Sequence, residues 1–429
     1  MTSHFDFGAP VAVLRRRRDL RLLLSASLVS LTGDWVLGVG LAYAVYDLTG
    51  STLASAVTLL AAYVPHLVIG PLAGVFVDRW DRKRTMVIAN LFMAAAMVPL
   101  LWVKDADAVW LVYAVLLVQS VGEVFFSPAE QALLPGLVED EELLTANAVN
   151  GQVAQVARLV GSALGGVAAA AGGVPAVAVI DAVTFVVAAS LVAGIRARGP
   201  VARDAPRTAD QVLRDRVRAF GHDLRAGLRA ARGEPVVLTI IAFTVITCAG
   251  EGIMGTLFAP FVRDVLHGSG QVYGIVTGVQ AVGGIVGGVV AAGIGHRWSP
   301  TVLFGVGAVL FGCVDLAIFL YPLAYGEVWP AVVGMLLVGV PGAVTMAGYM
   351  TLFQRHTTDG ERGRVFSLLG LGRAVAVLIG TTSAGFLGEA VGIVPILALQ
   401  GVGYVVAGVM VLVALRGYVH ERAGAVPIT

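Results

Sequence analysis

Twelve apolar stretches, each long enough to cross a lipid bilayer, constrain the fold of this chain more than any other feature. An α-helix needs about 20 predominantly apolar residues to cross the ~30 Å hydrocarbon layer. Hydrophobic residues make up 57% of the chain and charged residues 13%, a composition that excludes a soluble globular protein. We therefore predict an all-α integral membrane protein with twelve transmembrane helices. Their approximate bounds are 21–46, 52–77, 85–103, 108–130, 147–171, 174–195, 236–261, 271–295, 301–320, 328–353, 365–388 and 391–415.

The distribution of basic residues predicts the orientation of these spans, because Lys and Arg favour the cytoplasmic side of a membrane. The chain has 29 Lys and Arg residues, and only two of them, Lys104 and Arg263, lie in the connections that follow odd-numbered spans. Most of the others lie at the N-terminus, in the connections that follow even-numbered spans, or in the C-terminal tail. This pattern predicts a multi-pass protein of the cytoplasmic (inner) membrane with both termini in the cytoplasm.

The longest connection, 196–235, is rich in arginine and carries apolar residues at helical spacing. This pattern predicts an amphipathic helix that lies on the inner leaflet. A basic face can also recruit nucleic acid, but its position between two sets of spans argues against that, and we expect no nucleic-acid partner. The apolar residues are Leu213, Val217, Phe220, Leu224 and Leu228.

Similar words recur in the two halves of the chain. "DRW" at 78–80 returns as "HRW" at 296–298, and "LLVQSVG" at 116–122 returns as "LLVGVPG" at 336–342. A duplication of six spans keeps both copies in the same orientation, and carriers with this symmetry bind substrate near the membrane midplane between the halves. The predicted domains are a six-helix bundle at 1–195, a cytoplasmic basic linker at 196–235, and a second bundle with its tail at 236–429.

The connection after the second span, "GVFVDRWDRKR" at 74–84, resembles the loop signature of the major facilitator superfamily. The resemblance implies the two-bundle major facilitator fold and a gate on the cytoplasmic side. The latch residues that it implies are Gly74, Asp78, Arg79, Arg82 and Lys83.

In this gate Asp78 would accept hydrogen bonds from the N-terminus of span eleven, near Val365. Arg79 or Arg82 would reach Glu130, at the end of span four. The alternative is that these charges only keep the loop in the cytoplasm.

Spans four to six carry a narrower resemblance, in "FFSPAEQALLPGLVEDEELLTANAVNGQVAQVARLVGSALGG" at 125–166. This stretch looks like the branch of drug:proton antiporters that contains macrolide-efflux and enterobactin-exporter proteins. Two features depart from that branch: Ser162 replaces the proline of its span-five G-P-x-x-G-G pattern, and no arginine lies in the middle of span four. The resemblance implies export, and implies proton coupling less directly.

Charged residues inside spans are the candidates for coupling protons to substrate, because a charge at the bilayer centre costs about 2.5–3.5 kcal/mol. Asp34 and Glu251 occupy equivalent places in the first span of each half, and we predict that they exchange protons or contact substrate. A structural hydrogen bond between helices is the alternative. Glu123 has only Ala343 at the equivalent position, as expected for an acid that serves specificity.

The other charges within spans receive supporting roles. Arg158 is interpreted as a counter-ion for one of the acids, with Glu123 as the nearest candidate, and Arg373 as a residue of the interface between the halves. Asp181 and Asp315 are interpreted as helix-packing acids, although Asp181 remains a candidate for coupling.

Aromatic residues in the spans could line a cavity for a hydrophobic substrate, and we predict this for Trp35, Phe126 and Phe258. The alternative is packing within each bundle or contact with lipid. Glycine stripes such as "GSALGG" at 161–166 and "GGIVGG" at 283–288 are interpreted as helix-contact surfaces. No phosphate-binding loop, metal motif or set of catalytic groups is evident, so we expect neither cofactor, metal nor enzymatic activity.

These features predict a monomeric secondary exporter of hydrophobic or amphipathic small molecules, driven by proton antiport through alternating access. One alternative is a dedicated exporter of a single metabolite, such as a siderophore or a self-made antibiotic. An alternative of another class is a membrane sensor or scaffold that does not transport and that uses the basic linker as its output.

Overall fold

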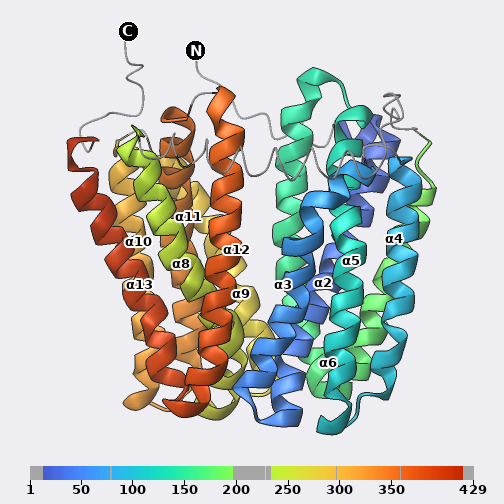
Figure 1. The fold of residues 1–429 in the computed structure, drawn as a ribbon, viewed down its shortest axis with the longest axis horizontal. Coiled ribbons are helices and arrows are strands. Elements are labelled where there is room, and N and C mark those ends of the chain that lie inside the picture. The colour runs from blue at the N-terminus through green and yellow to red at the C-terminus, as the bar shows by residue number, and fades with distance from the viewer. Residues whose placement is uncertain are drawn as a thin grey trace. The chain divides into compact units, whose positions relative to one another are not determined.

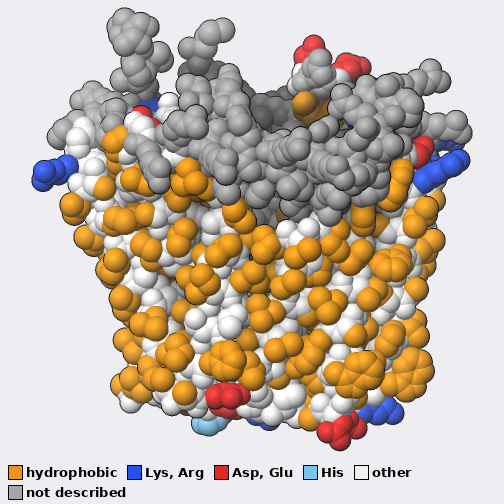
Figure 2. All heavy atoms as spheres, viewed as in Figure 1, with side chains coloured by type: hydrophobic (Ala, Val, Ile, Leu, Met, Phe, Trp, Pro, Cys, Tyr) orange, Lys and Arg blue, Asp and Glu red, His pale blue; other side chains and the backbone are white. Residues whose placement is uncertain are grey.

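The computed structural model describes residues 13–77, 80–196, 228, 233–295, 297–357 and 359–418. Within these residues all regular elements are helices, and none is a strand (Figure 1). Eleven of the described helices are long and apolar enough to cross a membrane. Hydrophobic side chains cover the described surface along the helices, whereas charged side chains gather near helix ends (Figure 2). The prediction of an all-α membrane protein is confirmed.

The chain divides into two compact units. Unit 1 consists of Met1–Leu48 and Ala61–Leu213, and unit 2 of Thr49–Leu60 and Arg214–Thr429. The long helices are α2 (Arg18–Thr49), α3 (Thr52–Val77), α4 (Arg82–Ala96), α5 (Val109–Leu133), α6 (Leu143–Ala193), α8 (Pro235–Pro260), α9 (Gly270–Ile294), α10 (Pro300–Leu320), α11 (Trp329–Arg355), α12 (Asp359–Ala390) and α13 (Ile393–Ala414). Short helical turns lie at η1 (Val98–Trp102), η2 (Ala106–Ala108), η3 (Leu134–Leu137), η4 (Asp140–Glu142), η5 (Phe261–Val265), η6 (Tyr321–Leu323) and η7 (Arg416–Tyr418).

Helix α6 contains two of the predicted spans. At about 1.5 Å per residue, a continuous helix of its 51 residues would be more than twice as long as the ~30 Å hydrocarbon layer is thick. Gly173 interrupts it with φ 59° and ψ −151°, a conformation that favours glycine. Gly161 of the first arm and Asp181 of the second arm lie against consecutive residues of α2, so the chain folds back between them. The twelve predicted spans are therefore present, two of them as the arms of α6.

Several helices begin where the sequence supplies a capping residue. Asp81 caps α4, because its carboxylate accepts a 2.9 Å hydrogen bond from the backbone N–H of Arg84. Ser299 caps α10 by accepting from the backbone N–H of Val302, and Pro300 follows at the first helical position. These caps satisfy N–H groups that have no partner inside the helix.

The glycine stripes are helix-contact surfaces, as predicted. In unit 1, a methyl group on Gly165 would meet the main chain of α2. In unit 2, Gly283 and Gly287 of α9 lie against the main chain of α11, whereas Gly284 and Gly288 face open space. Only the glycines that face a neighbouring helix therefore permit the close approach.

The beginning of α3 belongs to unit 2 and packs against α12. The Thr52 hydroxyl donates a 2.8 Å hydrogen bond to the carbonyl of Gly385. The Ser51 hydroxyl donates a 2.6 Å hydrogen bond to the carboxylate of Glu389. These contacts hold the first turn of α3 in place within unit 2.

Candidate functional site

Acidic side chains gather inside unit 1 from three helices. Asp34 of α2 interacts electrostatically with Glu123 and Glu130 of α5 and with Asp181 of α6. The Asp181 carboxylate lies against Gly33, next to Asp34, at a point where a methyl group would not fit. The structure therefore brings together four of the acids that the sequence analysis singled out.

A histidine that the sequence analysis missed completes this cluster. His66 of α3 places Nε2 3.4 Å from the carboxylate of Glu123. Its Nδ1 lies 3.1 Å from the carbonyl oxygen of Ala62, and because a carbonyl can only accept, Nδ1 carries a proton. The contact between Nε2 and Glu123 then needs one more proton, on the imidazole or on the carboxyl group. The pair is therefore built to share a proton between two helices.

Arg158 was expected to be the counter-ion of one of the acids, with Glu123 as the nearest candidate, and this stays a prediction. The ion pair described for Glu123 is with His66. The guanidinium of Arg158 lies over the ring of Trp35, 5.1 Å from its centroid, which is within the range of a cation–π interaction.

Asp181 is fully buried within unit 1. The hydroxyl of Thr184 lies 3.3 Å from Asp181 Oδ1, and Oδ2 has no hydrogen-bond partner among the described residues. This burial between α6 and α2 fits the interpretation of Asp181 as a helix-packing acid. Its neighbour Asp34 is only half-buried, so Asp34 is the more accessible of the two carboxyl groups.

Glu130 was expected to pair with Arg79 or Arg82 at the cytoplasmic gate. In the structure its carboxyl group lies against the hydroxyl of Ser27 in α2. Ser27 also lies 3.0 Å from the carbonyl of Leu23, and a hydroxyl has one proton to donate. Through these two contacts the hydroxyl of Ser27 connects Glu130 of α5 to α2. Arg79 lies outside the described residues, so the pairing of Glu130 with Arg79 or Arg82 at a closed gate remains a prediction.

The basic residues of the loop motif hold helix ends together. Arg82 donates a 2.7 Å hydrogen bond to the carbonyl of Ala132 at the end of α5, and Lys83 donates a 2.6 Å bond to the carbonyl of Ile195 after α6. Cations at these carbonyls complement the negative ends of the helices. Gly74 lies within α3, and Asp78 and Arg79 lie outside the described residues, so the rest of the predicted gate remains a prediction.

The equivalent acid of unit 2 has a different partner. Glu251 of α8 forms a 3.3 Å ion pair with Arg373 of α12, and their side chains are 43% and 65% exposed. Cys248, one turn earlier in α8, is a buried free thiol close to this pair. The two halves therefore treat their matching acids differently: Asp34 has acidic neighbours, whereas Glu251 is neutralised by an arginine.

The Glu251–Arg373 pair is expected to contribute little to stability, because both side chains are well exposed. Reversing either charge should lower stability, and the double exchange Glu251→Arg with Arg373→Glu should recover about 0.2–1 kcal/mol of coupling free energy. Thermal unfolding of the four proteins in detergent measures this coupling. Strictly additive effects of the two changes would contradict the pairing.

Aromatic rings pack around the polar residues of unit 2. The hydroxyl of Tyr349 lies 3.4 Å from that of Thr244, and the ring of Phe243 contacts both Tyr349 and Tyr404. Tyr404 also interacts electrostatically with Glu251. This aromatic cluster, Phe243, Tyr349 and Tyr404, adjoins the ion pair.

The predicted cavity aromatics are only partly supported. Trp35 is half-buried and contacts Arg158. Phe126 and Phe258 are buried, 8% and 3% exposed, and their place in a substrate cavity remains a prediction. Their spacing along the chain could not distinguish a buried helix face from an exposed one.

Within the described residues, no group of three or more His, Cys, Asp or Glu side chains is arranged to hold a metal ion. Cys248 and Cys313 are both free thiols. The sites described above are therefore ion pairs, proton-sharing contacts and aromatic surfaces, which suit binding and proton exchange.

Comparisons with known proteins identify the family and the fold. A family model described as a transmembrane secretion effector matches residues 9–424. Macrolide efflux protein A of Streptococcus pyogenes is 25% identical over 373 residues, which cover 85% of this chain and 88% of that protein. The staphyloferrin A transporter of Staphylococcus aureus is 22% identical over 392 residues, which cover 89% of this chain and 92% of that protein. The crystal structure of a bacterial homologue of the human lysosomal transporter Spinster has a TM-score of 0.72 at 13% identity and covers 98% of this chain and 100% of its own, a likeness of fold.

Proposed function

Since the chain belongs to the transmembrane secretion effector family of major facilitator transporters, we propose that it exports hydrophobic or amphipathic small molecules from the cytoplasm in exchange for protons. The similarity to macrolide efflux protein A supports export of such compounds. The observation that carries proton exchange is the His66–Glu123 contact, because it requires a shared proton. In this proposal both termini and the basic helix ends of unit 1 face the cytoplasm.

The proton-binding site is the cluster of unit 1. His66 of α3 and Glu123 of α5 share the exchanged proton, and Asp34 of α2 adjoins them. The other charged groups that face the cluster are Glu130 of α5 and, from α6, Asp181 and Arg158. Carboxyl groups outnumber the cations here, so mutual repulsion favours proton uptake when substrate leaves.

Substrate binding involves the half-exposed groups of unit 2. Glu251 and Arg373 offer a carboxylate and a guanidinium, and the half-buried rings of Tyr349 and Tyr404 offer an apolar surface next to them. An amphipathic molecule needs both kinds of contact. Asp78, Arg79, Arg82 and Lys83 close the cytoplasmic side in this proposal.

The driving force is adequate for efflux. One proton that moves inward supplies about 2.3 kcal/mol per 100 mV of membrane potential. For an uncharged substrate exchanged for one proton, this supports a gradient of about 50-fold per 100 mV.

The experiment that tests the function is efflux of ethidium from energised cells that express the protein. Wild-type cells should lose preloaded dye faster than cells with an empty vector, and a protonophore should remove the difference. Glu123→Gln should lose the efflux at an unchanged protein level in the membrane, because the amide cannot take up the proton that Glu123 shares with His66. Efflux that persists after the protonophore collapses the gradient would contradict proton exchange.

A dedicated metabolite exporter is the second candidate, favoured by the similarity to the staphyloferrin A transporter. A panel of unrelated toxic compounds separates the two functions. Protection against several of them supports the broad exporter, whereas protection against none supports a dedicated one.

A further inference from the structure

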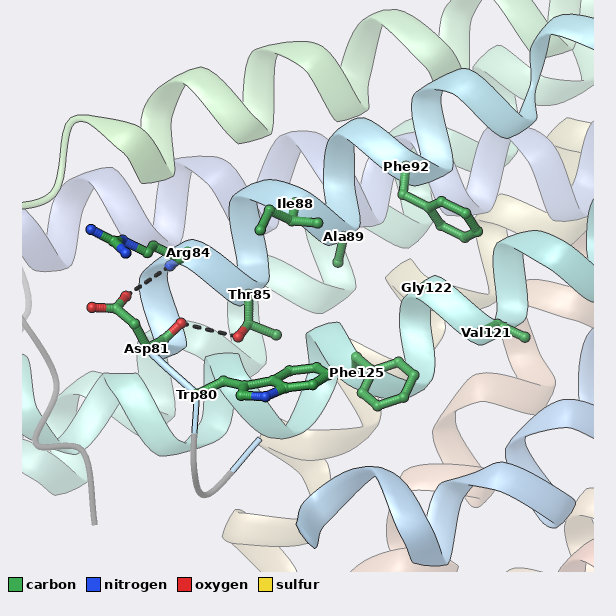
Figure 3. A pocket seen from close by; sticks show the side chains of 10 residues that line it. All are labelled: Trp80, Asp81, Arg84, Thr85, Ile88, Ala89, Phe92, Val121, Gly122 and Phe125. Carbon is green, nitrogen blue, oxygen red and sulfur yellow. Dashed lines mark hydrogen bonds between the residues drawn. The ribbon is translucent and has the colours of Figure 1, made fainter. Parts of the chain in front are cut away.

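A cavity of about 600 Å³ lies between α4 and α5 of unit 1 (Figure 3). Its walls include Ile88 and Phe92 of α4 and Phe125 of α5, and Trp80 closes it just before α4 begins. The rings of Trp80 and Phe125 pack together with their centroids 5.7 Å apart. The volume is within the range of about 300–1,000 Å³ that small-molecule sites occupy.

The cavity has a polar end and an apolar end. Asp81 and Arg84 line the polar end, and the apolar walls continue along α4 as far as Phe92 (Figure 3). The carboxylate of Asp81 is occupied as the cap of α4, where it accepts from the backbone N–H of Arg84. The Arg84 side chain is exposed and makes no ion pair with the described residues.

The charge around the polar end is basic. Arg82 and Lys83 precede Arg84 and donate to backbone carbonyls, which carry no formal charge. Three cations therefore lie within one turn, and among the described residues that line the cavity Asp81 is the one acid. This end favours an anionic group.

The cavity is open on the apolar surface of the helices. Trp80, Ile88 and Phe92 are 47%, 66% and 44% exposed. In a membrane protein an exposed surface of this composition lies against lipid, and Trp prefers the boundary between hydrocarbon and headgroups. The position of Trp80 beside the basic end places that boundary at the mouth of the cavity.

The cavity is separate from the proton-binding cluster. Val121 and Phe125 lie one turn apart on one face of α5 and line the cavity. Glu123 lies between them in sequence, so its side chain leaves the opposite face of the helix and contacts His66 of α3. An occupant of the cavity would therefore not touch the acids of the cluster.

We propose that this cavity binds an anionic phospholipid of the leaflet on its basic side. The phosphate group lies at Arg84, and one acyl chain lies along Ile88 and Phe92, next to Phe125. Basic pockets between transmembrane helices on the cytoplasmic side are suited to such headgroups. The lipid stabilises the packing of α4 against α5.

The test uses the purified full-length protein in vesicles that contain a phospholipid brominated in its acyl chain, which quenches nearby tryptophan. The contribution of Trp80 is the fluorescence quenching of the wild type minus the quenching of Trp80→Phe. The affinity of the site for brominated phosphatidylglycerol should be about fivefold higher than for brominated phosphatidylcholine. This factor corresponds to the attraction of an anionic lipid by about one basic residue near the membrane surface. Arg84→Gln should remove this preference.

Two variants serve as controls. Lys104→Gln removes the same charge beyond the other end of α4 and η1, and it should keep the preference for phosphatidylglycerol. Ala89→Phe fills the cavity, and it should reduce quenching of Trp80 by both lipids. Equal quenching of the wild type by the two lipids, or a preference that survives in Arg84→Gln, would overturn the proposal. Relief of the quenching by ethidium would also overturn it, because the cavity would then take the transported substrate.

Discussion

Replacing Glu123 with Gln is expected to remove the pH dependence of substrate binding. In an antiporter whose proton site and substrate site are coupled, a proton bound at one weakens substrate binding at the other, and this coupling is typically about 5–150-fold. Wild-type affinity for ethidium should therefore fall at least about fivefold as the pH is lowered through the titration of the cluster. Glu123→Gln should bind weakly at every pH, because a neutral amide resembles the protonated carboxyl group. Fluorescence titrations of the purified protein over a series of pH values measure this effect.

The fold should tolerate this change, which makes the result interpretable. The amide of a glutamine can donate to Nε2 of His66, so the contact between α3 and α5 is kept while the titration is lost. Glu327→Gln removes an exposed acid from the connection before α11 and is the matched control, with an unchanged pH dependence. A Glu123→Gln protein whose affinity still follows pH would show that another group binds the exchanged proton.

The second large effect is expected for Gly283→Ala. A methyl group at this position would lie 1.9 Å from the carbonyl oxygen of Leu336, so α9 and α11 would have to separate. Overpacking of this kind costs about 1–3 kcal/mol, and an obstacle in the main chain cannot rotate away. The melting temperature in detergent should fall by several degrees. A thiol-reactive dye that labels the buried Cys248 on unfolding measures this temperature.

The neighbouring glycine provides the control. Gly284 has no atom within 4 Å of the position that a methyl group would take. Gly284→Ala should therefore leave the melting temperature unchanged or raise it, since alanine is the better helix former. Equal destabilisation by the two changes would contradict the assignment of Gly283 to the contact surface.

The unequal partners of the matching acids suggest how a duplicated bundle acquires direction. In unit 1, Asp34 adjoins groups that share a proton, and in unit 2 Arg373 balances Glu251. A cation beside a carboxyl group favours its charged form, whereas neighbouring carboxylates favour proton uptake. If the predicted duplication holds, it kept the positions of the two acids and gave them different neighbours, in line with the proposed separation of proton exchange from substrate contact.

The spans and their packing could be predicted from the sequence because hydropathy and glycine spacing act locally. A run of about 20 apolar residues has one stable arrangement in a bilayer. The glycines at 161–166 and 283–288 mark close helix approach for a similar local reason. The predicted spans 147–171 and 174–195 also implied that the chain reverses its direction near Gly173, because two consecutive spans can cross the same membrane only in opposite directions.

The partners of the charged residues could not be predicted in the same way, because they depend on helix rotation. Hydropathy does not determine whether Glu130 faces α2 or the loop, and the structure directs it to Ser27. Phe126 and Phe258 are buried for the same reason. The signal for His66 was present in the sequence, as an ionisable residue within span two, and counting only Asp, Glu, Lys and Arg overlooked it.

The most direct measurement of proton-coupled export is ethidium transport in proteoliposomes with an imposed pH gradient. With the vesicle interior more acidic than the medium, protons leave as substrate enters through inside-out protein. We expect the wild type to concentrate ethidium in the vesicles. An ionophore that exchanges K⁺ for H⁺ should abolish this accumulation, and Glu123→Gln should not accumulate ethidium. If the wild type accumulates the same amount of ethidium with and without the pH gradient, export is not coupled to protons.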